Sequence, residues 1–342
     1  MNKRTLLTGV VVLALSSVSV STADTASRTG SRETTTTAHT GTALTGQIAF
    51  RRYLDPAEST GAIFITTANG SGEHQITTPP PATLDEEPDW APDGKHLLFT
   101  RFTNVGTDHE AHQLFVVASD GTGLTPLTPG HPAQGTFIAG FDGTGAFSPD
   151  GTLIAFSYAH GKATSQIQFS DIWVMNADGS NRRQVSHLPA YAGDVGGVAW
   201  SPNGKHLVYS LTNTKRRALF TVNVDGTHGH RLTPWSLGAN GAPEWAPTNR
   251  VVFRAVVDDE SGVGNFFSIR ADGTGLNQIT HFTNTVISHK VGYSPDGKRI
   301  VFAKAAGSGK NHLFTSKING SDLRRLTNNP AADSSADWAP TP

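Results

Sequence analysis

One short phrase recurs six times along this chain and limits what the chain can fold into. Each copy places an aromatic residue before Ser or Ala and then Pro, and four copies continue with Asp or Asn and then Gly. The six aromatic residues are Trp90, Phe147, Trp200, Trp245, Tyr293 and Trp338. Their spacing of roughly 45 to 57 residues is a period typical of a repeated, blade-sized structural unit.

The segments between the copies all follow the same order. A run rich in Val, Ile, Leu and Phe is followed by a variable loop, a second run that ends in Asp-Gly or Asn-Gly, and a short run that ends in Thr or Ser. Period-2 alternation predicts strands, and Asx-Gly predicts a tight hairpin in which both turn residues have positive φ. Each unit is therefore predicted to hold four antiparallel strands, a to d. A β-sandwich with unrelated turns is the alternative, and six matching copies disfavour it.

The two ends of the repeat region complement each other. The first unit has candidate strands b, c and d at Gln47 to Arg52, Ala62 to Gly70 and His74 to Thr77, but no strand a, and Ser335 to Ala339 is a strand a without followers. Pairing these ends removes two unpaired strand edges. The sequence therefore predicts an all-β fold, a six-bladed β-propeller over residues 46–342 that is closed by the C-terminal strand. The six aromatic rings are expected to pack between blades rather than to stack on a ligand.

The Trp-Ser-Pro-Asp-Gly phrase with a downstream Asp-Gly hairpin resembles the PD40 (WD40-like) repeat of TolB-like propellers, over about residues 46–342. That resemblance implies the fold more than a function, because similar repeats occur in prolyl oligopeptidase-type peptidases, tricorn-like proteases and oligogalacturonate lyases. TolB carries an α/β domain before its propeller, where this sequence has a signal and a short tether. The Gly-x-Ser-x-Gly nucleophile motif of the peptidases is absent from this sequence.

The first 45 residues have the composition of an export signal and a linker. Lys3 and Arg4 precede the apolar run Leu6 to Val20, and Ser21-Thr22-Ala23 offers a small-x-small cleavage site. Residues 1–23 are therefore predicted to be a secretory signal peptide, with an uncleaved anchor as the alternative, and 24–45 a disordered Ser/Thr-rich tether. An extracytoplasmic location, secreted or periplasmic, follows from the signal.

Charge and composition narrow the classes of partner. The formal net charge is −1, with 27 basic and 28 acidic residues, so no basic field is available for nucleic acid or for a membrane surface. No membrane insertion is expected after signal cleavage. The absence of cysteine excludes disulfides, thiolate metal sites and a cysteine nucleophile. A closed propeller leaves few free strand edges, so a monomer is predicted.

The variable loops are expected to lie on one face and to carry the binding site, because loop variation on a rigid scaffold sets specificity. The loops before the inner strands place polar residues around the predicted channel mouth: Asp85, Glu87, Asp142, Asp194, Asn240, His289, Lys290 and Asp333. Further acids lie close by at Glu86, Asp89, Glu244 and Asp337. An acidic mouth could accept a cation, Ca²⁺ included, or a basic segment of a partner. Alternatively, each Asp or Asn closes its own loop through backbone hydrogen bonds.

Histidine and lysine leave further alternatives open. His289 and Lys290 form a basic pair that could bind an anionic group or balance the carboxylates. The segment Asp108 to His112 is not a His-Glu-x-x-His motif. His131, His187 and His281 lie near the ends of d strands, where long loops could bring them to a metal.

We therefore predict a non-catalytic binding or scaffolding propeller that takes a protein partner or a small ligand and needs no cofactor, with Ca²⁺ left open. The main alternative is a metal-dependent extracytoplasmic lyase or hydrolase that acts on carbohydrate. A third is a peptidase propeller that works with a separate hydrolase chain.

Overall fold

The computed structural model describes residues 44–341 except 106, 108–109, 130–136, 163–166, 189–192, 214–215, 257–262 and 308. The chain divides into Met1–Ala43 and Leu44–Pro342, and only the second unit is described. The predicted signal, nearly all of the predicted tether, Asp108, His109 and His131 lie outside the described residues. Within the described part, no helix is long and apolar enough to span a membrane.

The fold is all-β, as predicted, and its strands group into units of four. The first unit combines β24 (Asp333–Trp338), β1 (Gln47–Tyr53), β2 (Gly61–Thr67) and β3 (His74–Gln75). The next units are β4 (Thr83–Trp90), β5 (His96–Thr103), β6 (Ala111–Ala118) and β7 (Thr125–Pro126), then β8 (Phe137–Phe147), β9 (Leu153–Lys162), β10 (Ile167–Asn176) and β11 (Arg183–Gln184). The others are β12 (Asp194–Trp200), β13 (His206–Asn213), β14 (Arg216–Asn223) and β15 (His230–Arg231), then β16 (Ala239–Trp245), β17 (Arg250–Val256), β18 (Gly264–Arg270) and β19 (Asn277–Gln278), and finally β20 (Ile287–Tyr293), β21 (Arg299–Ala305), β22 (Asn311–Lys317) and β23 (Arg324–Arg325). A 3₁₀ turn, η1 (Trp235–Leu237), precedes β16.

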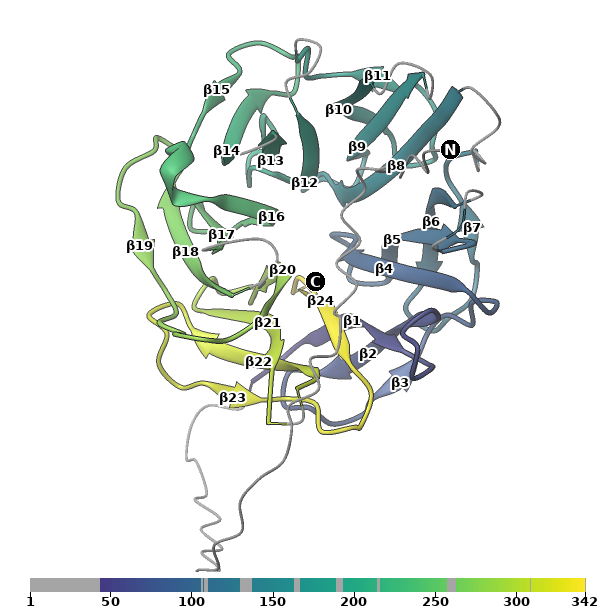
Figure 1. The fold of residues 1–342 in the computed structure, drawn as a ribbon, viewed down its shortest axis with the longest axis vertical. Helices are drawn as coiled ribbons and strands as arrows, with labels where there is room; N and C mark the ends of the chain where they lie inside the picture. The colour runs from purple at the N-terminus through teal and green to yellow at the C-terminus, as the bar shows by residue number, and fades with distance from the viewer. Residues whose placement is uncertain are drawn as a thin grey trace, which may run out of the picture. The chain divides into compact units, whose positions relative to one another are not determined.

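Neighbouring strands within each unit pair antiparallel, and two pairs of units are joined into eight-stranded sheets by single parallel bridges, Gly61 to Leu84 and Ala242 to Lys290. Figure 1 shows the sheets around a common centre, with β4, β12, β16, β20 and β24 innermost and the two-residue strands outermost. The C-terminal strand β24 pairs with β1, as predicted, with Ile48 opposite Trp338 and Arg52 opposite Asp333.

The repeated aromatic residues pack against the preceding unit. Trp200 belongs to a core cluster with Ile172 and Val174, and Tyr293 to one with Val252 and Phe266. Five of the six rings retain at most 6% of their surface exposed, and the sixth, Phe147, is half-buried. The prediction that these rings seal the blades is therefore confirmed at five positions, and Phe147 differs.

The Thr or Ser that ends each unit stops the outer strand after two residues. Its hydroxyl accepts a hydrogen bond of 2.8–3.0 Å from a backbone N–H of strand c, fourteen residues earlier. The six hydroxyl residues are Thr77, Thr128, Ser186, Thr233, Thr280 and Thr327. A buried donor without an acceptor costs about 1–3 kcal/mol, so the hydroxyl replaces the backbone partner that a longer strand d would supply.

The Asx-Gly hairpins differ from the prediction in one respect. Glycine has positive φ, for example +84° at Gly121, but the preceding Asp120 does not. Gly121 N–H donates to Ala118 C=O, and the Asp120 carboxylate accepts from Thr122 N–H at 2.9 Å. The glycine of the Asx-Gly pair is therefore left-handed while the side-chain bond fixes the Asp in an ordinary conformation, and a second left-handed glycine, Gly123 at +68°, follows before β7.

A β-bulge interrupts the first strand of every unit before its aromatic residue. Glu87 and Ser335 have positive φ at the bulge, +55° and +52°. A bulge re-aims side chains that strict alternation would send to the other face. Because these strands are the innermost ones, the bulges decide which residues meet near the centre.

Candidate functional site

Charged side chains from four units gather between the inner strands. We define the axial cluster as Glu87 and Asp89 on β4, Glu244 on β16, Lys290 on β20 and Asp337 on β24. Lys290 is 3% exposed, and its Nζ donates to the C=O of Pro88 on β4. The four carboxylates all lie near enough to interact electrostatically with this one ammonium.

Two members of the axial cluster connect neighbouring blades. Asp337 accepts a 2.9 Å hydrogen bond from Trp90 N–H, and Asp89 accepts one of the same length from Phe147 N–H. Each carboxylate therefore joins its own strand to the aromatic position of the next unit, and bonds to ionised acceptors are stronger than neutral ones. Gly292 occupies the corresponding place on β20, where a Cβ would lie 3.1 Å from the Asp337 Cα.

Burial and mutual repulsion perturb these carboxyl groups. Desolvation, with repulsion from Asp337, raises the pKa of Asp89 to about 7. Desolvation and two neighbouring carboxylates raise the pKa of Glu244 well above its ordinary value, and desolvation raises that of Asp337. Burial opposes the charge on Lys290, but the four carboxylates outweigh it and raise the pKa of this lysine. The cluster therefore keeps its cation charged, and Asp89 takes up and releases its proton near neutral pH.

The exposed end of the cluster is a contact between distant blades. His289 on β20 bonds through Nε2 to the Glu87 carboxylate, and Thr144 on β8 donates to the same carboxylate. The His289 side chain is 37% exposed, whereas that of Glu87 is 10% exposed. Burial would raise the pKa of Glu87, but His289, Lys290 and Arg51 lower it. Beside this contact, Arg51 forms an ion pair with Glu86.

Two predicted mouth residues lie in ion pairs inside their own blades. Asp85 is fully buried and binds Arg101 on β5 through two bonds of 2.6 and 2.8 Å. Asp333 is fully buried and binds Arg52 on β1 at 2.7 and 3.4 Å. In each case the arginine stands directly opposite the aspartate in the strand register.

The other predicted residues divide between the axial cluster and separate positions. Glu87, His289 and Lys290 are brought together. Asn240 is half-buried opposite Arg254, and Asp194 is exposed at the start of β12. Asp142 lies on β8 opposite Tyr158, and its side chain is outside the described part.

Five further residues belong to the site: three were predicted only as nearby acids, and two were not predicted. Asp89, Glu244 and Asp337 form the inner part of the cluster, and Thr144 and Arg51 complete its exposed end. The signal was present in the repeat, because the residue directly before the aromatic is acidic in three copies.

The metal site predicted from His131, His187 and His281 stays a prediction, because His131 lies outside the described residues. In the part of the chain that the structure describes, no three His, Cys, Asp or Glu side chains are placed to hold a metal ion. His112 is 6% exposed, bonds to Glu110 at 2.8 Å and contacts the Phe102 ring. His187 and His281 follow the outer strands β11 and β19.

Four-stranded antiparallel units with aromatic rings between them, gathered around charged inner strands, define a β-propeller. The family model for the TolB β-propeller domain (PD40) matches residues 144–341. The chain belongs to this TolB-like propeller family, as its repeats predicted.

Relatives and solved structures agree on the fold. An uncharacterized Agrobacterium fabrum protein is 26% identical over 64% of this chain and 65% of its own length. The Tol-Pal system protein TolB of Anaeromyxobacter dehalogenans is 34% identical over 30% of this chain and 19% of its own. The chain thus spans less than two thirds of the length of these relatives.

The structure of TolB from Acinetobacter baumannii has a TM-score of 0.64 and 16% identity, covering 87% of this chain and 67% of that one. A chain of a nidogen/laminin complex has a TM-score of 0.61 and 13% identity, covering 86% and 98%. At these identities the similarity shows the fold alone.

Proposed function

We propose that this chain is a closed, six-bladed, non-catalytic propeller over residues 46–342 that binds a basic segment of a protein partner. The pairing of β24 with β1 supports closure, because it completes the first unit from the two ends of the repeat region. The binding surface is the exposed end of the axial cluster together with the variable loops around it.

The observation that carries the proposal is the arrangement of Glu86, Glu87 and His289 at that end. The Glu87 carboxylate receives His289 from a blade 202 residues away, and the histidine is partly open to solvent. Behind the pair lie three more carboxylates and one ammonium. The Glu87 carboxylate stays ionised because its neighbours lower its pKa, and in a partly desolvated site it attracts a cationic group and aligns it, which is how electrostatic complementarity selects partners.

Similar proteins support an assembly role. One relative is named as a component of the Tol-Pal system. From the predicted signal, we propose an extracytoplasmic location after cleavage of residues 1–23. We also propose that the protein is a monomer and that it needs no nucleic acid, membrane insertion or cofactor.

A direct test uses hexalysine as the probe and calorimetry as the readout. The wild-type chain should bind hexalysine with an affinity that falls as salt rises, and E86Q/E87Q should weaken binding at least fivefold. The matched control D225N removes a carboxylate from the turn between β14 and β15 and should bind as the wild type does. Equal affinity of wild type and E86Q/E87Q would contradict the proposed surface.

The natural partner is tested with a photo-crosslinking residue in two positions. A crosslinker at His289 should capture one protein reproducibly from the envelope or medium of the producing cell. The same residue at Lys298, whose side chain is 80% exposed on the turn between β20 and β21, should not capture that protein. Capture of the same protein from both positions, or from neither, would count against the axial end as the interface.

A further inference from the structure

The blade seal is incomplete at one position, between the unit β4–β7 and the unit β8–β11. Four of the six aromatic positions hold tryptophan and a fifth holds tyrosine, all at most 6% exposed, but the remaining position, on β8, holds the smaller and half-buried Phe147. A hollow of about 360 Å³ opens beside this ring. The hollow lies on the Pro-Asp-Gly turns, at the opposite ends of the inner strands from the loops proposed above to bind a partner.

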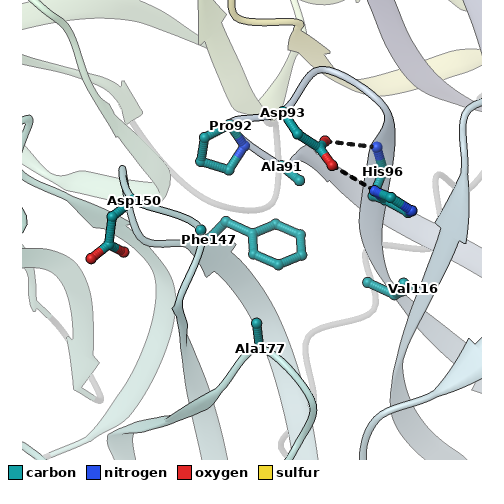
Figure 2. A pocket seen from close by; sticks show the side chains of 9 residues that line it. Ala91, Pro92, Asp93, His96, Val116, Phe147, Asp150 and Ala177 are labelled. Carbon is teal, nitrogen blue, oxygen red and sulfur yellow. Dashed lines mark hydrogen bonds and ion pairs between the residues drawn. The ribbon is translucent and has the colours of Figure 1, made fainter.

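The walls of this hollow are mainly apolar. Figure 2 shows the Phe147 ring between Pro92 and Ala177, with Val116 to one side. The volume is at the lower end of the range of ligand pockets, which are typically lined by apolar and aromatic groups with a few polar ones at the edge. The geometry therefore suits one flat apolar side chain rather than a large ligand.

The chain itself shows which ring fits between two of its blades. At the equivalent position of the next unit, Trp200 is 6% exposed and its Nε1 donates at 3.0 Å to the C=O of Ala146. Because position 147 holds a phenyl ring where the next unit has an indole, the volume of one further ring is left unfilled between the two blades. An indole or phenol supplied from outside would restore the packing seen in the other units.

Two carboxylates flank the hollow. Asp93 is bonded to His96 Nδ1 at 2.7 Å on one side, and Asp150 stands on the other (Figure 2). Slight burial opposes ionisation of Asp93, but hydrogen bonds from Lys95 N–H and His96 outweigh it and lower its pKa. Hydrogen bonds from Ser148 and Thr152 lower the pKa of Asp150. Both groups are charged at neutral pH, so the edge of the hollow favours a cation.

We infer that this slot is a second binding site, for an aromatic side chain of a partner polypeptide flanked by lysine or arginine. The apolar walls and Phe147 hold the ring, and the carboxylates of Asp93 and Asp150 hold the adjacent cations. The site does not depend on the axial cluster.

The test measures binding of the blocked tripeptide Lys-Trp-Lys to the full chain by calorimetry, with Lys-Ala-Lys as the probe that lacks the ring. F147W should fill the slot and weaken Lys-Trp-Lys binding at least tenfold, while hexalysine binding stays unchanged. D93N/D150N should weaken it several-fold. The matched control D296N alters the equivalent turn beside the buried Tyr293 and should have no effect.

Three results would overturn the inference. These are equal affinity of wild type and F147W, equal affinity for Lys-Trp-Lys and Lys-Ala-Lys, and binding of free tryptamine as tight as that of the peptide, which would assign the slot to a small amine. Thermal unfolding verifies that each variant is folded. If F147W does not fold, the comparison of D93N/D150N with D296N decides, since both change only exposed turn carboxylates.

Discussion

One prediction concerns Asp89, whose pKa the axial cluster raises into the physiological range. Its folded-state pKa of about 7 exceeds the ordinary 3.8, because the carboxyl is desolvated and faces Asp337. Between these two values the folded chain holds a proton that the unfolded chain has released. The free energy of unfolding therefore falls as the pH rises from about 4 to 7, and it stays at the lower value above pH 7.

The size of the effect follows from that gap. At 1.36 kcal/mol per pH unit, the difference between about 7 and 3.8 corresponds to about 4 kcal/mol as an upper limit. Because Asp89 is coupled to neighbouring acids, part of this shift belongs to the group as a whole, so about 2 kcal/mol is expected for Asp89 alone. D89N keeps the shape and an oxygen that accepts from Phe147 N–H, but it has no proton to release.

The assay is urea unfolding, followed by tryptophan fluorescence, of wild type and D89N from pH 4 to pH 8. The free energy of unfolding of D89N, relative to wild type, should increase by about 2 kcal/mol across this range. The control D225N removes an exposed carboxylate whose pKa hydrogen bonds from Thr227 lower, and its difference from wild type should change little between pH 5 and 8. A D89N difference that is constant with pH would refute the reasoning, because Asp89 would then titrate as an exposed acid.

Three further changes test other parts of the structure. T233V leaves Leu219 N–H without the acceptor that it has at 2.9 Å, and should lower the free energy of unfolding by about 1–3 kcal/mol, with T233S near wild type, in urea titrations. R101M leaves the fully buried Asp85 without its partner and should cost about 3–5 kcal/mol, and the double variant D85L/R101M should recover much of this loss in the same titration. W200A opens a cavity between two blades and should cost about 3–5 kcal/mol, visible as a lower midpoint of thermal unfolding, whereas a loss below 1 kcal/mol would contradict a sealing role.

The repeat alone predicted most of the fold. Each unit encodes its own four strands, because Pro-Asp-Gly and Asx-Gly turns and alternating apolar residues act over short distances along the chain. The unit that begins at Gln47 lacks its strand a, and the chain ends with a strand a near Trp338 that has no strands after it. This complementarity also predicted the pairing of β24 with β1. The prediction that the Asx residue of the hairpins has positive φ was wrong, because its side chain bonds to the following backbone and only the glycine of the Asx-Gly pair has positive φ.

The site was predicted less well than the fold. Asp85 and Asp333 share a repeat position with the other mouth residues, and sequence position alone could not show that an arginine stands opposite each of them. The bulges before the aromatic residues also break the alternation from which side-chain direction is inferred.

The sequence by itself determined the units, their order and the rings that seal them, since these depend on residues near one another in the chain. Only the tertiary structure decided which charges meet, because Asp89, Glu244, Lys290 and Asp337 come from different units and converge only when the inner strands share one centre. The same holds for the hollow beside Phe147, which is a matter of volume left between two blades. Local patterns set strands and turns, whereas electrostatic coupling and packing volume depend on distances through space.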